Sequence, residues 1–209
     1  MNIEVRCAEP SDARAIAELH AASWRNTYRG VFSETYLDGD VQEERQRHWL
    51  QCLMLDPRQD QGVLVAMVEG ELAGFICIYL DAEPGWGPLL DNLHVRSDCR
   101  GRGIGQCLIQ AGIAWMRARG SFDRWYLWVV EANAPARRIY EHLGWAPGER
   151  TIHVAADGTE FAVLRYTQRL AEFCCKVEDR SVLPSPKPQS GSFSGKGPDA
   201  GPGLAAPGA

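Results

Sequence analysis

The sequence predicts one α/β domain over residues 1–170, followed by a disordered tail over residues 171–209. The 209 residues suffice for one ordinary domain with a sizeable core. Apolar runs with strand character alternate with helical patterns along most of the chain. Near residue 171 the composition changes, and the last segment holds six of the twelve prolines and six of the 21 glycines. Such a segment buries too little apolar surface to offset its ordering entropy.

The first half of the domain is predicted to contain three strands and two helical regions. The first helix should begin at Ser11, whose hydroxyl suits an N-cap. Glu69-Gly70 lies between two apolar runs and is typical of a tight hairpin turn. In chain order, we expect a strand at 3–7, a helix ending near residue 24, an irregular helical region at 34–53, and strands at 63–68 and 72–80.

The second half is predicted to contain two helices and four strands. The helix at 105–119 carries apolar residues at helical spacing, and the helix at 135–143 has a proline in its first turn, where the missing N–H is tolerated. Asp157-Gly158 marks a turn between the last two strands. The four strands are expected at 89–95, 125–130, 151–154 and 160–170.

Charge and cysteine usage exclude several classes of function. The net charge of −5 gives no bulk attraction to nucleic acid or to an anionic membrane. No apolar run approaches the roughly 18 residues of a membrane helix, and the N-terminus lacks a signal-peptide core. The seven cysteines show no paired metal-type spacing. We therefore expect a cytoplasmic protein with reduced thiols and without a metal site.

A strand followed by a glycine-rich turn and a helix is the most informative segment. The turn, residues 100–106, reads Arg-Gly-Arg-Gly-Ile-Gly-Gln. Glycines let the backbone approach a ligand, and the first N–H groups of a helix lack internal partners, so this turn predicts an anion site. No lysine follows as in a P-loop, and the third glycine of a dinucleotide fingerprint is missing.

Two motifs resemble signatures of the GNAT superfamily of N-acetyltransferases. Arg100-x-x-Gly103-x-Gly105 is similar to its pyrophosphate-binding motif. Asn133-x-x-Ala136-x-x-x-Tyr140 is similar to its second signature, about 30 residues later, and the resemblance covers roughly residues 3–170. It implies a mixed, mostly antiparallel seven-stranded sheet flanked by about four helices, in which two central strands splay apart and admit an acyl-thioester arm.

The resemblance also implies acetyl-CoA as cosubstrate, with no metal, and assigns residues to it. Asn133 would hydrogen-bond the pantetheine arm, although it also suits a helix N-cap. Tyr140 would lie near the thioester sulfur as proton donor, although it could be a core aromatic. The other expected contacts to the coenzyme are Leu93, His94 and Val95 through the backbone of their strand, the turn residues Arg100, Gly101, Arg102, Gly103, Ile104, Gly105 and Gln106, and Arg137 at the 3′-phosphate.

The general base is less defined by the sequence. Some family members carry a glutamate five residues before the asparagine of the second motif, and Trp128 occupies that position here. Asp91 has the same strand parity as Leu93 and Val95, so we expect it to face the cleft and act as the base. Glu131 and a water chain are alternatives.

The function expected from the resemblance is transfer of an acetyl group to a primary amine of a small molecule or peptide by direct attack. A non-catalytic acetyl-CoA-binding regulatory module on the same fold is the alternative. Aromatic residues between Trp24 and Tyr36 fit either an acceptor pocket or the core. A homodimer is compatible with the sequence.

Overall fold

The computed structural model describes residues 2–155 and 158–171, which form seven strands and four α-helices. The strands are β1 (Ile3–Cys7), β2 (Gln61–Val68), β3 (Glu71–Tyr79), β4 (Leu89–Val95), β5 (Arg124–Val130), β6 (Ala146–Val154) and β7 (Glu160–Arg169). The α-helices are α1 (Ala13–Thr27), α2 (Val41–Leu50), α3 (Ile104–Arg117) and α4 (Ala134–His142). Four short helical turns are η1 (Pro10–Asp12), η2 (Tyr36–Asp40), η3 (Gln51–Leu55) and η4 (Ser97–Cys99).

The strands form one sheet in the order β1-β2-β3-β4-β5-β7-β6. Every neighbouring pair is antiparallel except β4 and β5, which are parallel. The predicted mixed, mostly antiparallel sheet of seven strands with four helices is therefore confirmed.

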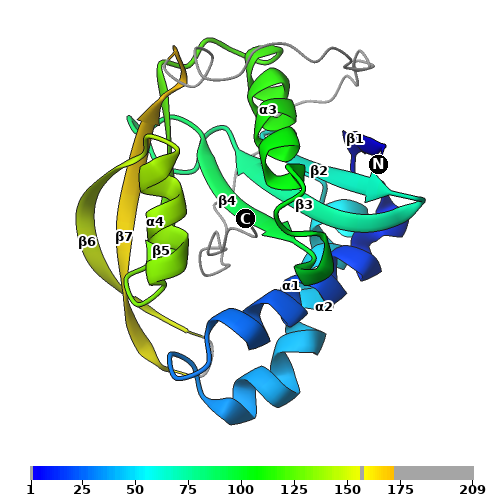
Figure 1. The fold of residues 1–209 in the computed structure, drawn as a ribbon, viewed down its shortest axis with the longest axis vertical. Helices are drawn as coiled ribbons and strands as arrows, with labels where there is room; N and C mark the ends of the chain where they lie inside the picture. Colours follow the sequence, from blue (N-terminus) through cyan, green and yellow to red (C-terminus); the bar gives the residue numbers. More distant parts are fainter. Residues whose placement is uncertain (1, 156–157, 172–209) are drawn as a thin grey trace.

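Helices cover both faces of the sheet (Figure 1). On one face, α3 and α4 pack on alternate side chains of β2 to β5, and the predicted apolar stripe of α3, which includes Leu108 and Met116, is buried there. On the other face, α1 and α2 cover a cluster on β2 and β3, and the end of α1 covers an aromatic cluster on β5 and β7. Each buried Leu or Ile side chain contributes about 1.5–3 kcal/mol of stability.

The first helix begins differently from the prediction. Ser11 is exposed, and the carboxylate of Asp12 accepts a hydrogen bond from the Glu9 N–H at 2.7 Å. The same carboxylate pairs with Arg6 at 2.7 Å, which lowers the pKa of Asp12. A charged carboxylate satisfies both donors, which the Ser11 hydroxyl cannot do, so Asp12 organises the turn and α1 follows it.

The β2–β3 hairpin follows its predicted turn chemistry. Glu69 and Gly70 both have positive φ, 54° and 83°, as a turn that matches strand twist requires. The predicted Asp157-Gly158 turn lies partly outside the described residues, since residue 157 is not among them. The predicted tail likewise concerns residues beyond 171, which the described part of the chain does not include.

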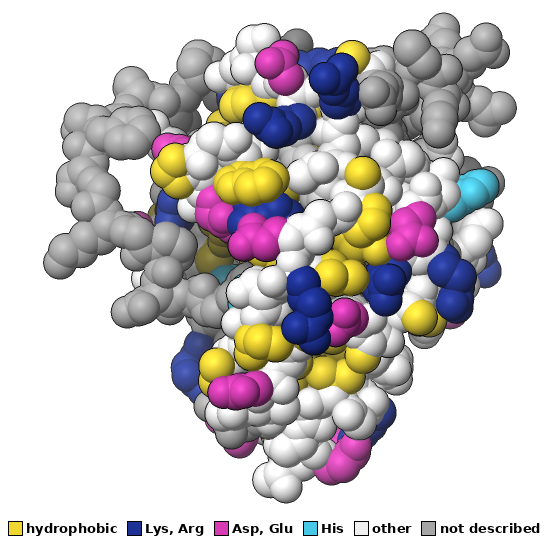
Figure 2. Space-filling view, turned by 90° about the vertical axis from the view of Figure 1, so that its left-hand side faces the viewer, with side chains coloured by type: hydrophobic (Ala, Val, Ile, Leu, Met, Phe, Trp, Pro, Cys, Tyr) yellow, Lys and Arg dark blue, Asp and Glu magenta, His cyan; other side chains and the backbone are white. Residues whose placement is uncertain are grey.

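Strand β6 forms one edge of the sheet and carries exposed apolar side chains. Ile152 is 49% exposed and Val154 60% exposed. The face of the molecule seen in Figure 2 shows hydrophobic side chains scattered between acidic and basic ones. The homodimer stays a prediction, which light scattering would test. Among the described helices, none combines the length and the apolar character needed to cross a bilayer.

Candidate acyl-thioester site

The central parallel strands β4 and β5 meet at one end only. Leu89 pairs with Tyr126, and the Tyr126 N–H donates to the carbonyl of Pro88 at 3.0 Å. Beyond this contact, β4 stays paired with β3 and β5 stays paired with β7. Within residues 2–155 and 158–171, the edges that β4 and β5 turn toward each other therefore have no ladder partner across the gap. Backbone N–H and C=O groups in such a wedge are suited to bind an extended, amide-containing ligand.

The predicted coenzyme contacts on β4 have their side chains in the core. Leu93 and Val95 face α3 and are buried, at 3% and 2% exposure. His94 points to the opposite face, where its Nδ1 lies 2.8 Å from Ser23 Oγ. The side chains of all three residues therefore have structural roles, and only their backbone groups are placed to meet a ligand along the β5 side of the strand.

The glycine-rich turn has the backbone geometry of an anion site. Gly101 and Gly103 have φ of 71° and 80°, a region that L-residues rarely adopt. Gly103 is the N-cap of α3, and helix geometry leaves the N–H groups of Ile104, Gly105 and Gln106 without intrahelical partners. A Cβ at Gly101 or Gly103 would meet nothing within 4 Å, so both positions require glycine for φ rather than for space.

The arginines near this turn differ in their availability. Arg96 is held by Glu71 at 2.9 Å and by Asp98 at 2.7 Å. Arg100 donates weakly to the Val95 carbonyl at 3.4 Å and is exposed, as is Arg102. Arg100 and Arg102 thus place positive charge at the turn, and Arg96 is held by two carboxylates.

Asn133 is the N-cap of α4, and only one of its two polar side-chain atoms forms a hydrogen bond with the described residues. Its Oδ1 accepts from the Ala136 N–H at 3.2 Å, which confirms the N-cap interpretation. Its Nδ2 is buried and has no hydrogen-bond partner among the described residues. The amide therefore caps the helix with one atom and leaves a donor for a ligand.

Tyr140 lies on α4 and packs in the core cluster on the α3 side of the sheet. Its side chain is fully buried, and its hydroxyl has no hydrogen-bond partner in the described part of the chain. Burial, with the nearby Tyr28 hydroxyl, raises the pKa of Tyr140 above its ordinary range. A buried, unpartnered hydroxyl costs stability, so its retention is informative about function.

Arg137, the predicted contact for the 3′-phosphate, lies one turn from the start of α4. Its Nε donates to the Tyr166 hydroxyl at 3.3 Å and its Nη1 to the Glu131 carbonyl at 3.1 Å. These two hydrogen bonds hold the guanidinium in place and occupy some of its N–H donors.

Asp91 lies on a different face from the one predicted. A bulge interrupts the β3–β4 register between Cys77↔Asn92 and Ile78↔Leu90, so Asp91 has no partner position in β3. The bulge breaks strand alternation, and the Asn92 amide donates to the Asp91 carboxylate at 2.5 Å. The charge of Asp91 acts on Cys77 and Tyr79, on the face opposite Leu93 and Val95. The parity argument was therefore wrong, although Asp91 is buried next to the splay.

The other carboxylates near the second motif are held by arginines. Glu131 pairs with Arg150 at 2.8 Å, which lowers the pKa of Glu131 and weakens it as a base. Glu83 was not predicted as a site residue, yet its carboxylate accepts from the indole of Trp128 at 3.2 Å. It also pairs with the buried Arg165 at 2.8 Å. No pattern in the sequence marks Glu83, because it belongs to the loop between β3 and β4.

A buried histidine pair beside β4 was also missed by the sequence interpretation. The rings of His20 and His94 lie 4.7 Å apart between centroids. His20 Nδ1 accepts from the Trp49 indole at 3.1 Å, so His20 is neutral with its proton on Nε2. Burial lowers the pKa of His20 well below its usual value and that of His94 to about 3. Both rings are uncharged packing elements at neutral pH.

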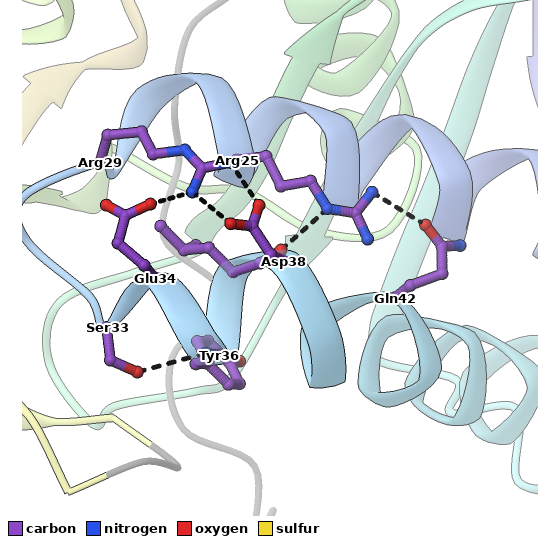
Figure 3. Close-up of polar contacts among 8 residues, drawn as sticks. Arg25, Arg29, Ser33, Glu34, Tyr36, Asp38 and Gln42 are labelled. Carbon is purple, nitrogen blue, oxygen red and sulfur yellow. Dashed lines mark hydrogen bonds and ion pairs between the residues drawn. The ribbon is translucent and has the colours of Figure 1, made fainter.

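The segment after α1 is tied back to that helix by polar contacts (Figure 3). Arg29 forms ion pairs with Glu34 and Asp38, and the guanidinium lowers the pKa of Asp38. Arg25 donates to the Leu37 carbonyl at 2.8 Å. These contacts hold the residues between α1 and α2 against the aromatic cluster on β5 and β7.

The splayed strands β4 and β5 lie beside a glycine-rich turn that opens α3 and is suited to bind phosphate groups. This arrangement is that of an acyltransferase whose acyl donor is a thioester carrying phosphate groups. The comparison with known families identifies it further: residues 16–145 match the Acetyltransferase (GNAT) family. The chain belongs to this family. It is an acetyltransferase that uses acetyl-CoA as cosubstrate. Among the described residues, no group of three or more His, Cys, Asp or Glu side chains is arranged to hold a metal ion.

Several relatives are similar in sequence. The uncharacterized N-acetyltransferase YuaI of Bacillus subtilis is 29% identical over 78% of this chain and 88% of its own. A spermidine N(1)-acetyltransferase of Thermoplasma acidophilum is 25% identical over 77% of this chain and 95% of its own. A mycothiol acetyltransferase of Thermobispora bispora is 36% identical, but over 51% of this chain and only 34% of its own.

Solved structures share the fold at low sequence identity. The PaiA N-acetyltransferase of Thermoplasma acidophilum, solved with coenzyme A, has a TM-score of 0.61 at 22% identity and covers 78% of this chain and 98% of its own. The yncA protein of Salmonella typhimurium, solved with acetyl-CoA, has a TM-score of 0.57 at 18% identity, over 88% of this chain and 99% of its own. At these identities the likeness concerns the fold.

Proposed function

We propose that the protein transfers the acetyl group of acetyl-CoA to a primary amine of a small molecule or peptide by direct attack of the amine. The observation that carries this proposal is the one-ended pairing of β4 and β5, with the Gly101–Gly103 turn after β4 and, on α4 after β5, a buried Tyr140 hydroxyl that has no hydrogen-bond partner among the described residues. The free thiols of the five described cysteines also support a cytoplasmic location.

The coenzyme contacts follow from the free polar groups at the wedge. Backbone groups of Leu93, His94 and Val95 pair with the pantetheine arm, and Asn133 Nδ2 donates to it. The N–H groups of the turn and of the first residues of α3 bind the pyrophosphate, where the helix dipole favours negative charge. Arg100, Gly101, Arg102, Gly103, Ile104, Gly105 and Gln106 make up this cradle, and Arg137 lies toward the 3′-phosphate.

The attacking amine must lose a proton. A lysine-like amine has a pKa of about 10.4, so at pH 7 only roughly one in a few thousand is neutral. A positioned base typically gives about 10²–10⁴-fold in rate. Asp91 is our candidate, because the bulge turns its carboxylate to the α1 face of the sheet, beside Tyr79 and Tyr126. Glu131 is the weaker candidate because Arg150 stabilises its charged form.

The leaving group must gain a proton. Coenzyme A leaves as a thiolate with a parent pKa of about 8.5. Tyr140 stays protonated at neutral pH because burial raises its pKa, so its hydroxyl is present as a donor to the sulfur. Holding the amine and thioester together supplies much of the remaining rate gain.

The decisive test is an assay of coenzyme A release from acetyl-CoA with a panel of amine acceptors. The panel should contain polyamines, aminoglycoside and streptothricin-type antibiotics, amino-sugar thiols and peptides with free N-termini. We expect release with at least one acceptor and recovery of the N-acetylated product by mass spectrometry. Tight binding of acetyl-CoA with no release for any acceptor would support the non-catalytic binding module instead.

A further inference from the structure

A buried arginine lies on the face of the sheet to which the β4 bulge turns Asp91. Arg165 comes from β7, and the register of β5 and β7 places it opposite Trp128. Counted from the Leu89–Tyr126 pair, Asp91 and Trp128 are each two residues farther along their strands. Asp91, Trp128 and Arg165 therefore follow one another across the sheet, with the gap between β4 and β5 after the first of them.

Three aromatic rings enclose the Arg165 guanidinium. Its Cζ lies 3.9 Å from the ring centroid of Trp86, 4.3 Å from that of Trp128 and 5.1 Å from that of Tyr126. Its Nε and Nη1 are buried and have no hydrogen-bond partner among the described residues. Since apolar residues commonly replace buried ion pairs without loss of stability, packing alone does not explain this charge. The arrangement indicates a function for Arg165.

Two carboxylates from different segments pair with the same nitrogen of Arg165. Its Nη2 lies 2.8 Å from Glu83 of the β3–β4 loop and 3.0 Å from Glu149 of β6. The second oxygen of Glu83 accepts from the Trp128 indole at 3.2 Å. Arg165 thus joins the β3–β4 loop, the indole of Trp128 and the edge strand β6 into one connected group.

The β3–β4 loop is also fixed where β4 and β5 meet. Gly87 packs so closely on β5 that a Cβ there would lie 2.4 Å from the Arg124 carbonyl oxygen. The carbonyl of Pro88 accepts a hydrogen bond from β5 at 3.0 Å. Trp86 directly precedes these residues, so the contacts hold its ring over Arg165. The group is therefore already assembled without a ligand.

The exposed charge of this group is acidic. The Arg165 side chain is 6% exposed, whereas those of Glu83 and Glu149 are 38% and 52% exposed. Two carboxylates and one guanidinium leave one negative charge in excess. A ligand that arrives from solvent meets the carboxylates and the Trp86 ring, and both kinds of group attract cations. An anionic ligand is repelled by the carboxylates before it reaches the guanidinium.

We propose that Arg165 is a positioning residue of the acceptor site, which selects a primary amine that carries a second cationic group. Arg165 holds Trp128 as the wall opposite Asp91, where the reacting amine lies. It also holds Glu83 and Glu149 beside that wall, where they bind the second cationic group. This proposal rests on the proposed function, because it names the class of acceptor for the same reaction.

The test compares three amines with the same four-carbon chain and a different charge at its far end. Putrescine is cationic there, n-butylamine is neutral and γ-aminobutyrate is anionic. Each is measured as a competitive inhibitor of coenzyme A release with the best acceptor of the amine panel. Putrescine should bind roughly tenfold or more tightly than γ-aminobutyrate, with n-butylamine between them, since the site attracts one charge and repels the other. Equal inhibition by the three amines, no inhibition by putrescine, or stronger inhibition by γ-aminobutyrate would overturn the proposal.

Glu149→Gln removes one exposed charge and should reduce the preference for putrescine over γ-aminobutyrate about threefold. Glu18→Gln is the matched control, because Glu18 on α1 is 54% exposed and likewise pairs with an arginine, Arg14, at 2.9 Å. It should keep the wild-type preference. A preference that survives in Glu149→Gln, or that falls equally in both variants, would contradict recognition by the glutamates.

Arg165→Lys tests the positioning role at constant charge. An ammonium lacks the planar fork that stacks between rings and reaches two carboxylates. KM for the best acceptor should rise about fivefold, and the Kd for acetyl-CoA should stay within about twofold. Glu83→Gln is the second variant for the case that Arg165→Lys does not fold. It can still accept from the Trp128 indole but lacks the charge, so it should lower the preference for putrescine as Glu149→Gln does.

The outcomes separate this proposal from the acetyltransferase activity itself. An active wild-type enzyme with no preference among the three amines, or with unchanged KM in Arg165→Lys and unchanged preference in Glu83→Gln, would refute only the proposed role of Arg165. A wild-type protein without coenzyme A release for any acceptor would refute the proposed function and this proposal with it.

Discussion

At the scale of single residues, the Tyr140 hydroxyl is the group whose environment is hardest to explain by packing alone. Its ring contacts Trp145 edge-on, which accounts for an aromatic residue at this position. Phenylalanine would make the same contact without a buried, unpartnered oxygen. The oxygen therefore costs stability in the absence of a ligand and needs a functional reason.

Replacement of Tyr140 by Phe should separate these two roles. We expect kcat to fall by at least tenfold, since the thiolate then leaves without a proton donor. The thermal midpoint should be unchanged or slightly raised, because an unsatisfied buried hydroxyl has been removed. Steady-state kinetics and calorimetry measure the two effects, and an unchanged kcat would exclude Tyr140 as the donor.

Asp91 gives a second prediction at this scale. Asp91→Asn keeps the size of the side chain but removes the base, so kcat/KM should fall by about 10²-fold or more. The comparison variant is Glu131→Gln, which breaks only an exposed pair with Arg150 and should retain activity. Equal losses in the two variants would contradict Asp91 as the base.

The sequence predicted which helices and strands carry the candidate site residues better than it predicted where each side chain points. Asn133 and Tyr140 could be found because their spacing on one helix is fixed by local geometry. The direction of the Asp91 side chain could not be predicted, because one extra residue in β4 reverses the alternation of side chains and no residue type in that strand indicates a bulge. Glu83 comes from a distant segment, and only the tertiary fold brings its carboxylate to Trp128 and Arg165.

At the scale of elements, the turn before α3 combines a left-handed glycine backbone with the proposed anion site. Gly103 has φ of 80° and serves as the N-cap of the helix. Because open space surrounds the position where a Cβ would be, a side chain would act on the backbone conformation and not through a clash. The turn can therefore be altered without disturbing the core.

Gly103→Val should thus reduce binding of acetyl-CoA more than stability. A β-branched residue at positive φ costs about 1–3 kcal/mol of strain, and the turn should relax away from the conformation that aims its N–H groups at the pyrophosphate. We expect at least a thirtyfold loss of affinity by calorimetry.

The matched control is Gly158→Val, at φ of 81° and likewise with nothing within 4 Å of its Cβ position, but in the turn between β6 and β7. It should suffer a similar loss of stability and retain affinity. Equal affinity losses in the two variants would mean that general strain, rather than the anion site, explains the result.

Element boundaries were predicted well where local chemistry determines them. Glu69-Gly70 forms a turn with positive φ, and Asn133 is the N-cap of α4. Both conformations favour a few residue types, so the sequence could predict them. The start of α1 could not be predicted, because the choice of Asp12 over Ser11 depends on Arg6 from the neighbouring strand. Long-range charge pairs of this kind leave no local pattern.

At the scale of the whole molecule, the buried histidine pair couples the fold to pH. His20 and His94 lie between α1 and β4, packed with Trp49, Phe75 and Ser23. Arg45 and Arg100 disfavour an imidazolium at this pair, and His94 and His48 disfavour one on His20 when they are themselves protonated. Both rings are therefore neutral in the folded state.

Stability should consequently fall as the pH decreases below about 6.5. The pKa of His94 is lowered to about 3 in the folded protein, whereas an unfolded histidine titrates near its ordinary value of about 6.5. Between these values the unfolded state binds more protons, so the free energy of unfolding decreases as the pH falls, by about 2 kcal/mol per histidine between pH 6.5 and pH 5.

Urea denaturation at pH 7.5, 6.0 and 5.0 measures this slope. In this pH range the change in stability comes from the histidines. The pKa values of Asp12, Asp38 and Asp98 are lowered, so their contribution to the free energy of unfolding is lost only at more acidic pH. His94→Asn can still hydrogen-bond Ser23 but does not titrate, so its dependence on pH in this window should be weaker than that of the wild type by the share of one histidine. The pKa values of His20, His48 and His153 are lowered as well, so these three still contribute. If the variant and the wild type lose stability equally, the acid sensitivity has another origin, and the pair does not act as a pH-sensitive part of the fold.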